Sequence, residues 1–201
     1  MSSMEIDEAG RESARQPQPD PALPARVIDV WDPLVRLIHW SLALAILLDG
    51  FVLEENLLHE WVGYAALGLV AVRLVWGVVG SAPARFSAFP PSPAAAFRHL
   101  RAILSGDRSA HLSHNPLGAL MAYNLWLSVL AVCATGVMMT TTAWFGVEWV
   151  EEAHEAAFAW VMASVALHLI GVALDTRRTG VGLVRAMVDG RKSVPAGVRV
   201  E

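Results

Sequence analysis

Four histidines lie within long apolar stretches of this sequence, where a polar ring is costly. His39 stands in PLVRLIHWSLALAILLDGFVL, His59 begins HEWVGYAALGLVAVRLVWGVVG, and EEAHEAAFAWVMASVALHLIGV holds both His154 and His168. An ionisable side chain inside an apolar span is by default a candidate for function. A neutral imidazole can bind a transition metal through a ring nitrogen, or it can relay a proton.

The spacing of these histidines favours the metal. His154 and His168 are fourteen residues apart, which is a rise of about 21 Å and a return to within about 40° of the same helix face. If each stretch spans a membrane, His39 lies at the depth of His168, and His59 lies at the depth of His154. Two such pairs are what two stacked haems with imidazole on both faces of each iron require. An apolar bundle core also suits a porphyrin.

Histidines within apolar spans also have other uses. A single histidine in a span is commonly a hydrogen-bonded packing residue or a member of a proton path. A proton path would string acids and histidines at intermediate depths, and the apolar stretches carry none there. A zinc site would need further ligands at one level, and only the outer pair has acidic neighbours. Haem ligation is therefore the preferred interpretation.

Four apolar blocks must position these rings. The chain of 201 residues is 55% apolar and only 17% charged, unlike an ordinary soluble domain. A hydrocarbon core about 30 Å thick takes about 20 helical residues. The blocks that are long enough, none of which alternates like a barrel strand, cover 33–53, 58–80, 116–140 and 149–174. We predict an all-α integral membrane four-helix bundle, whose first helix starts with Asp32 as N-cap.

The basic residues predict the orientation of the bundle. They gather in the loop 81–115 and in the segment 177–201, whereas the two other connections carry none. The positive-inside rule therefore places both termini and this loop in the cytoplasm. We expect a disordered, proline-rich tail over 1–26, a transmembrane dihaem domain over 27–176 and a basic tail over 177–201. Within the loop, AAFRHLRAIL is expected to form an amphipathic helix on the membrane surface.

Two arginines are expected at the depth of the inner histidine pair. Arg73 follows His59 by fourteen residues, the same spacing as that within the last apolar block. At this level a guanidinium can pair with a haem propionate, and snorkelling to the lipid headgroups is the alternative. Arg36, one turn before His39, has the same two interpretations.

The chain also resembles a known family. The motifs VWDPLVRLIHW, LHEWVGYAALGLVAVRLVWGVVGS, ARFSAF, HNPLGALM, EEAHE, VALHLIGV and LVRAMVDGRK together resemble the bacterial cytochrome b561 family. They look closest to its branch of cytochrome b subunits of nickel–iron hydrogenases, over about residues 28–192. The resemblance implies a dihaem cytochrome b of the bacterial inner (plasma) membrane, with two haem b cofactors, that exchanges electrons with the quinone pool.

The resemblance can be carried over to individual positions. The haem histidines of the family fall on the four histidines already selected: His39 and His168 for the inner iron, His59 and His154 for the outer iron. His114 and Asn115, in HNPLG, also match a family motif, and this match implies a contact with quinone or with a propionate near the inner haem.

The expected function is electron transfer across the membrane between a periplasmic redox partner and quinone. Carboxylates without any basic residue surround the outer pair: Asp49, Glu54, Glu55, Glu60, Glu148, Glu151, Glu152 and Glu155. Such a field attracts a basic protein such as a small c-type cytochrome and repels an anion. A hydrogenase is the partner that the resemblance suggests. Oxidation of superoxide, a second activity in the family, ranks lower because its substrate is an anion.

Two rivals come from other classes of protein: a haemless membrane anchor and a histidine-based carrier of divalent metal. A spectrum of the reduced minus the oxidised protein separates them, because only a cytochrome shows b-type haem bands. No nucleic-acid-binding pattern is present, and Cys133, as the only cysteine, excludes a disulfide within the chain. The sequence leaves open whether the chain forms a homodimer.

Overall fold

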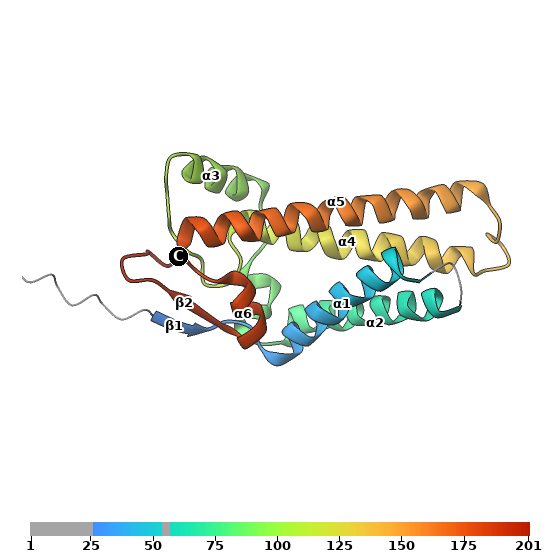
Figure 1. Ribbon diagram of the computed structural model, residues 1–201, viewed down its shortest axis with the longest axis horizontal. Helices are drawn as coiled ribbons and strands as arrows, with labels where there is room; N and C mark the ends of the chain where they lie inside the picture. Colours follow the sequence, from blue (N-terminus) through green and yellow to red (C-terminus); the bar gives the residue numbers. More distant parts are fainter. Residues whose placement is uncertain (1–25, 54–56) are drawn as a thin grey trace, which may run out of the picture.

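Four long helices form the body of the protein. The computed structural model describes residues 26–53 and 57–201, so the tail predicted for 1–26 lies outside the described residues except for Arg26. The helices long and apolar enough to cross a membrane are α1 (Pro33–Phe51), α2 (Leu57–Val79), α4 (Pro116–Met139) and α5 (Glu148–Thr179). Figure 1 shows them running along the length of the molecule. The predicted all-α membrane bundle is thereby confirmed.

Local sequence signals set the ends of these helices. Asp32 caps α1 by accepting a hydrogen bond from Val35 N at 2.9 Å, and proline occupies the first helical position, where no N–H is needed. Asn115 caps α4 in the same way. Gly180, at φ 72°, ends α5 in the left-handed conformation. With 32 residues, α5 is about 48 Å long and extends beyond the predicted span.

The helices pack in a definite order. α4 lies along α5, and α2 lies against both α1 and α4. In the middle of the bundle Val70, Val129 and Val161, from α2, α4 and α5, are buried against one another. Asn124 links α4 to α5, because its Nδ2 donates to Ser164 Oγ at 2.8 Å. The interior between the two ends of the bundle is therefore mostly apolar.

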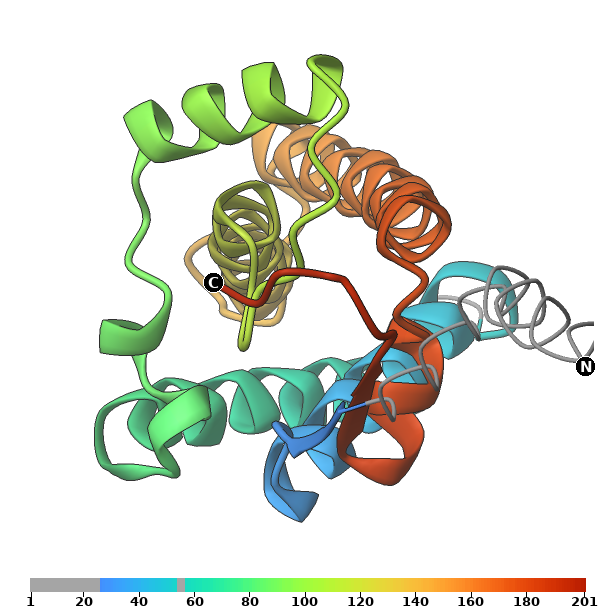
Figure 2. The ribbon, with the colours of Figure 1, turned by 90° about the vertical axis from the view of Figure 1, so that its left-hand side faces the viewer.

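The short elements gather at one end of the bundle (Figure 1). They are β1 (Arg26–Asp29), η1 (Ala82–Ala84), η2 (Phe86–Ala88), α3 (Pro93–Leu104), α6 (Leu183–Asp189) and β2 (Arg191–Val194). In Figure 2 α3 is seen lengthwise while α4 is seen almost end-on, so the predicted loop helix runs across the bundle direction. Its outward side carries exposed Phe97 and Leu104 next to arginines.

The C-terminal segment, expected to be a tail, is folded. β2 pairs antiparallel with β1, and α6 lies against the start of α1, where Trp40 Nε1 donates to Met187 O at 3.1 Å. Gly190, at φ 86°, turns the chain so that its carbonyl accepts from Val30 N and Trp31 N. Four-residue strands from opposite ends of the chain leave no local pattern, so the sequence did not reveal this pairing.

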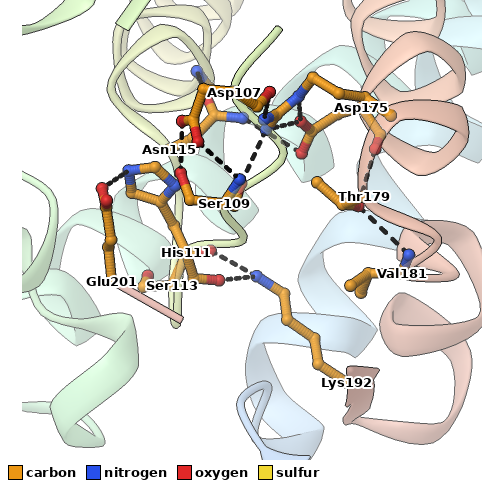
Figure 3. A network of polar contacts seen from close by, with 12 residues as sticks. Asp107, Ser109, His111, Ser113, Asn115, Asp175, Thr179, Val181, Lys192 and Glu201 are labelled. Carbon is orange, nitrogen blue, oxygen red and sulfur yellow. Dashed lines mark hydrogen bonds and ion pairs between the residues drawn. The ribbon is translucent and has the colours of Figure 1, made fainter. Parts of the chain in front are cut away.

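A network of polar contacts joins these short elements (Figure 3). Lys192, only 5% exposed, donates through Nζ to the carbonyls of His111, Leu112 and Ser113 at 3.0, 3.0 and 2.6 Å. Burial lowers the pKa of Lys192 to about 8. Nearby, Arg178 pairs with Asp175 at 2.6 Å. The network ties the C-terminal strand and the end of α5 to the segment that precedes α4.

Candidate functional site

The structure brings the four predicted histidines together as two pairs. His39 of α1 faces His168 of α5, with ring centroids 6.4 Å apart and ring planes at 54°. His59 of α2 faces His154 of α5 at 6.3 Å and 73°. One helix, α5, thus contributes a ring to each pair. The first pair lies toward the end of the bundle that carries the short elements, and the second lies toward the opposite end.

The distance between the two ring centroids of each pair can be compared with the distance expected when both rings bind one metal ion. A metal–imidazole bond is about 2.0 Å long, and a five-membered ring with bonds of about 1.35 Å places its atoms about 1.15 Å from the centroid. Two rings bound in line to one metal therefore have centroids about 6.3 Å apart. Both observed distances, 6.4 and 6.3 Å, match this value.

The number of protein ligands is also informative. Among the residues that the structure describes, no group of three or more His, Cys, Asp or Glu side chains could hold a metal ion. A structural zinc site closes with four protein ligands and a catalytic one uses three. Two ligands per level instead suit an iron whose remaining positions are filled by a macrocycle. The residues present therefore fit two bis-histidine haems.

Arg73 of α2 is buried within the bundle. Its side chain is 4% exposed, its Nη2 donates to Ala84 O at 3.0 Å, and its guanidinium lies 4.8 Å from the ring centroid of Trp126. Its Nη1 is buried without a hydrogen-bond partner among the described residues. A guanidinium buried in this way does not reach the lipid headgroups, so its position does not agree with snorkelling. A buried unpaired donor is costly, and a carboxylate of a bound group would satisfy it.

Arg36 has a protein partner. Its Nη1 donates to Val188 O at 2.5 Å, so this guanidinium holds the C-terminal end of α6 against α1. Its Nε is buried without a partner in the described part of the chain. The geometry thus gives Arg36 a structural contact that the sequence did not suggest, and its pairing with a propionate stays a prediction.

His114 lies near the inner pair, whereas Asn115 acts as a structural residue. The His114 ring packs 4.4 Å from the Phe89 ring and 4.9 Å from the Trp31 ring, measured between centroids. Burial, and then the charge of Lys192, lower the pKa of His114 to about 3, so this imidazole is neutral. Asn115 uses Oδ1 to cap α4 and Nδ2 to donate to Asp175 at 3.2 Å.

The outer pair has protein neighbours that sequence reasoning missed. Thr135 Oγ1 of α4 lies 3.0 Å from His154 Nδ1. Asp49 Oδ1 of α1 lies 3.7 Å from His59 Nδ1, and the Asp49 side chain is 18% exposed. A threonine in an apolar helix carries no signal of its own, because small hydroxyl residues are common at helix contacts in membranes. From the sequence, Asp49 stands out only as one of the outer carboxylates.

The remaining outer carboxylates are exposed. These are Glu60, Glu148, Glu151, Glu152 and Glu155, while Glu54 and Glu55 lie outside the described residues. No arginine or lysine occurs in 37–72 or 109–176. The end of the bundle that holds His59 and His154 is therefore acidic in sequence and, where described, acidic at its surface.

The model of the prokaryotic cytochrome b561 family matches residues 30–190. The match covers most of the chain, including all four transmembrane helices and both histidine pairs. No curated protein matches the chain.

Proposed function

We propose a path of two haems for this chain, which belongs to the prokaryotic cytochrome b561 family and is therefore a transmembrane b-type cytochrome that binds haem b and transfers electrons. His39 and His168 would hold the inner haem, and His59 and His154 the outer haem. The spacing of the two ring pairs, 6.4 and 6.3 Å, is the observation that carries this assignment. Family membership leaves the haemless anchor and the metal carrier without support.

Bound haem supplies a one-electron carrier at each level. The protein contributes ligation, distance and a dry interior. Because His154 and His168 are fourteen residues apart on one helix, the two levels are separated by about 21 Å. Between them Val70, Val129 and Val161 close the core, with exposed fractions of 0, 5 and 1%. Arg73 would hold an inner propionate, and its buried Nη1, which has no hydrogen-bond partner within the described residues, supports this role.

The charges at the two ends of the bundle support a different redox partner for each end. The exposed outer carboxylates favour a basic periplasmic protein, such as a small c-type cytochrome, over an anion such as superoxide. A hydrogenase is the other partner class that the family suggests. The inner end, with the arginines of α3 and α6, is predicted to face the cytoplasm, and membrane quinone would exchange electrons with the inner haem there.

The number and place of the haems can be tested in purified protein. We expect two b-type haems per chain by pyridine haemochromogen assay. We expect His39→Ala or His168→Ala to remove one haem, and His59→Ala or His154→Ala to remove the other. His111→Ala is the matched control, since this histidine belongs to neither pair, and it should retain both haems.

The same preparations also test the pairing and the substrate. If His39→Ala emptied the outer site, the pairing would be wrong, and if the wild-type protein held a single haem, the dihaem path would be wrong. Stopped-flow reduction separates the partners: a basic c-type cytochrome should react with a rate that falls as salt rises. Fast reduction by superoxide would instead favour the second family activity.

A further inference from the structure

The two outer histidines each have an oxygen atom beside Nδ1. For His154 this is Thr135 Oγ1 at 3.0 Å. The same hydroxyl lies 3.0 Å from two backbone carbonyls of its own helix, Ala131 O and Val132 O. A hydroxyl has one hydrogen to donate and two lone pairs with which to accept. When it donates to its own helix, as threonine in a helix commonly does, it must accept from the imidazole.

This contact selects one tautomer of His154. With Nδ1–H donating to Thr135, the proton lies on Nδ1 and the lone pair lies on Nε2. Nε2, the nitrogen farther from the backbone, then carries the lone pair that a metal ligand requires. Gly136 contributes to the same placement, because a Cβ built there would lie 3.2 Å from His154 Cε1 and 3.6 Å from Nδ1. The ring thus rests on the backbone of α4 with its Nδ1 turned to Thr135.

Asp49 acts on the other ring of the pair. A carboxylate can only accept, so Asp49 Oδ1, at 3.7 Å from His59 Nδ1, also favours the proton on Nδ1. This oxygen is buried and has no hydrogen-bond partner among the described residues. A small closing movement would bring it within hydrogen-bond distance. At the inner level, by contrast, His39 Nδ1 is buried without a hydrogen-bond partner in the described part of the chain.

We propose that Thr135 and Asp49 are positioning residues of the outer haem, and that they make it the lower-potential haem of the two. The inference rests on the proposed assignment of the ligands. An acceptor on Nδ1–H makes an imidazole a stronger donor to a metal, and stronger donation favours the oxidised iron. Buried Arg73 near the inner level and the carboxylates around the outer level act in the same direction.

The proposal gives the electron path a direction. With haem held at both levels, one electron at a time would pass from the outer site, which would be oxidised, to the inner site, which would be reduced, and no atom would be transferred. A periplasmic one-electron donor protein would supply the electrons, and quinone would accept two of them together with two protons. Inward transfer is then downhill within the chain.

Optical redox titration of the purified holoprotein tests this directly. The variants are Thr135→Val, which keeps the shape and removes the acceptor, Thr135→Ser, which restores it, and Asp49→Asn. The matched control is Thr141→Val, because Thr141 Oγ1 donates to Met138 O at 2.8 Å and no histidine contact of this hydroxyl occurs among the described interactions. The low-spin ferric EPR signal of each variant is recorded with the titration.

We expect the wild-type outer haem, identified as the one that His59→Ala removes, to titrate at the lower potential. Thr135→Val should shift its redox equilibrium toward the reduced form by about threefold, which is about 28 mV for one electron, and Asp49→Asn by about tenfold, about 59 mV. The inner haem should not move, Thr135→Ser should return the outer haem to near its wild-type potential, and Thr141→Val should change nothing.

Two results would overturn the proposal. One is an outer haem whose potential and EPR signal are unchanged by both Thr135→Val and Asp49→Asn. The other is a wild-type outer haem that titrates above the inner one. Either result would leave the proposed function standing, provided that the wild-type protein binds two haems and that each histidine variant loses the haem expected for its pair. Loss of haem from the wrong level in the histidine variants would instead refute the proposed function itself.

Discussion

Gly136→Ala is a direct test of how His154 is held. A Cβ at this position would lie 3.2 Å from His154 Cε1, whereas carbon atoms in contact prefer about 3.5 to 4.0 Å. The ring or the helix must therefore move by about 0.5 Å. The shift would change the spacing of the His59 and His154 rings, whose centroid distance of 6.3 Å already matches in-line ligation to one iron.

The energetic consequence can be estimated from two opposing effects. Overpacking of this kind costs about 1 to 3 kcal/mol, while replacing a glycine within a helix by alanine stabilises by about 0.5 to 1 kcal/mol. We expect a net destabilisation of about 0 to 2.5 kcal/mol, with the damage concentrated at the outer haem. The outer haem should be lost or partly high-spin, and the inner haem should be unchanged.

The assay is the haem content and the reduced-minus-oxidised spectrum of the purified variant. Gly171→Ala is the matched control, because Gly171 lies on α5 and a Cβ there would meet nothing within 4 Å. It should keep both haems and gain slightly in stability. If Gly136→Ala also kept both haems with unchanged spectrum and potential, the contact of the His154 ring with α4 would not matter for ligation.

Three further predictions follow from the other contacts. Replacing Arg73 by glutamine removes a buried cation near the inner level, so the potential of the inner haem should fall while that of the outer haem stays unchanged. In Arg73→Lys the potential of the inner haem should fall less, and redox titration measures both variants. Burial lowers the pKa of His114 from 6.5 to about 3, so between these values the unfolded chain binds a proton that the folded chain does not. Stability should therefore rise with pH across this window, by up to about 1.4 kcal/mol per pH unit, and thermal unfolding of His114→Phe should lose that contribution; an unchanged slope would refute the account of this ring. The exposed carboxylates of α5 are Glu148, Glu151, Glu152 and Glu155. Replacing them by glutamine should slow electron exchange with a basic c-type cytochrome and make its rate less dependent on salt in stopped-flow experiments. A rate that stays salt-dependent would point to a different docking surface.

Several features of this protein were determined locally and could be predicted from the sequence. The span boundaries follow from the length of each apolar run, and the start of α1 follows from Asp32 and the proline after it. The two levels of histidine follow from helical periodicity, since fourteen residues return to nearly the same face. These inferences succeed because a hydrocarbon layer demands helices of a known length, so depth can be counted along the chain.

What lies beside each ring was decided only by the tertiary structure. Thr135 and His154 are brought together by the packing of α4 on α5, and Arg36 and Val188 meet across 152 residues of sequence. Asn115, for which the sequence predicts a contact with quinone or a propionate, also caps α4 and donates to Asp175. A lateral contact depends on how helices rotate and pack about their axes, which a local pattern does not specify. The sequence alone thus determined which residues reach each depth, and the packing of the helices determined what each of them touches.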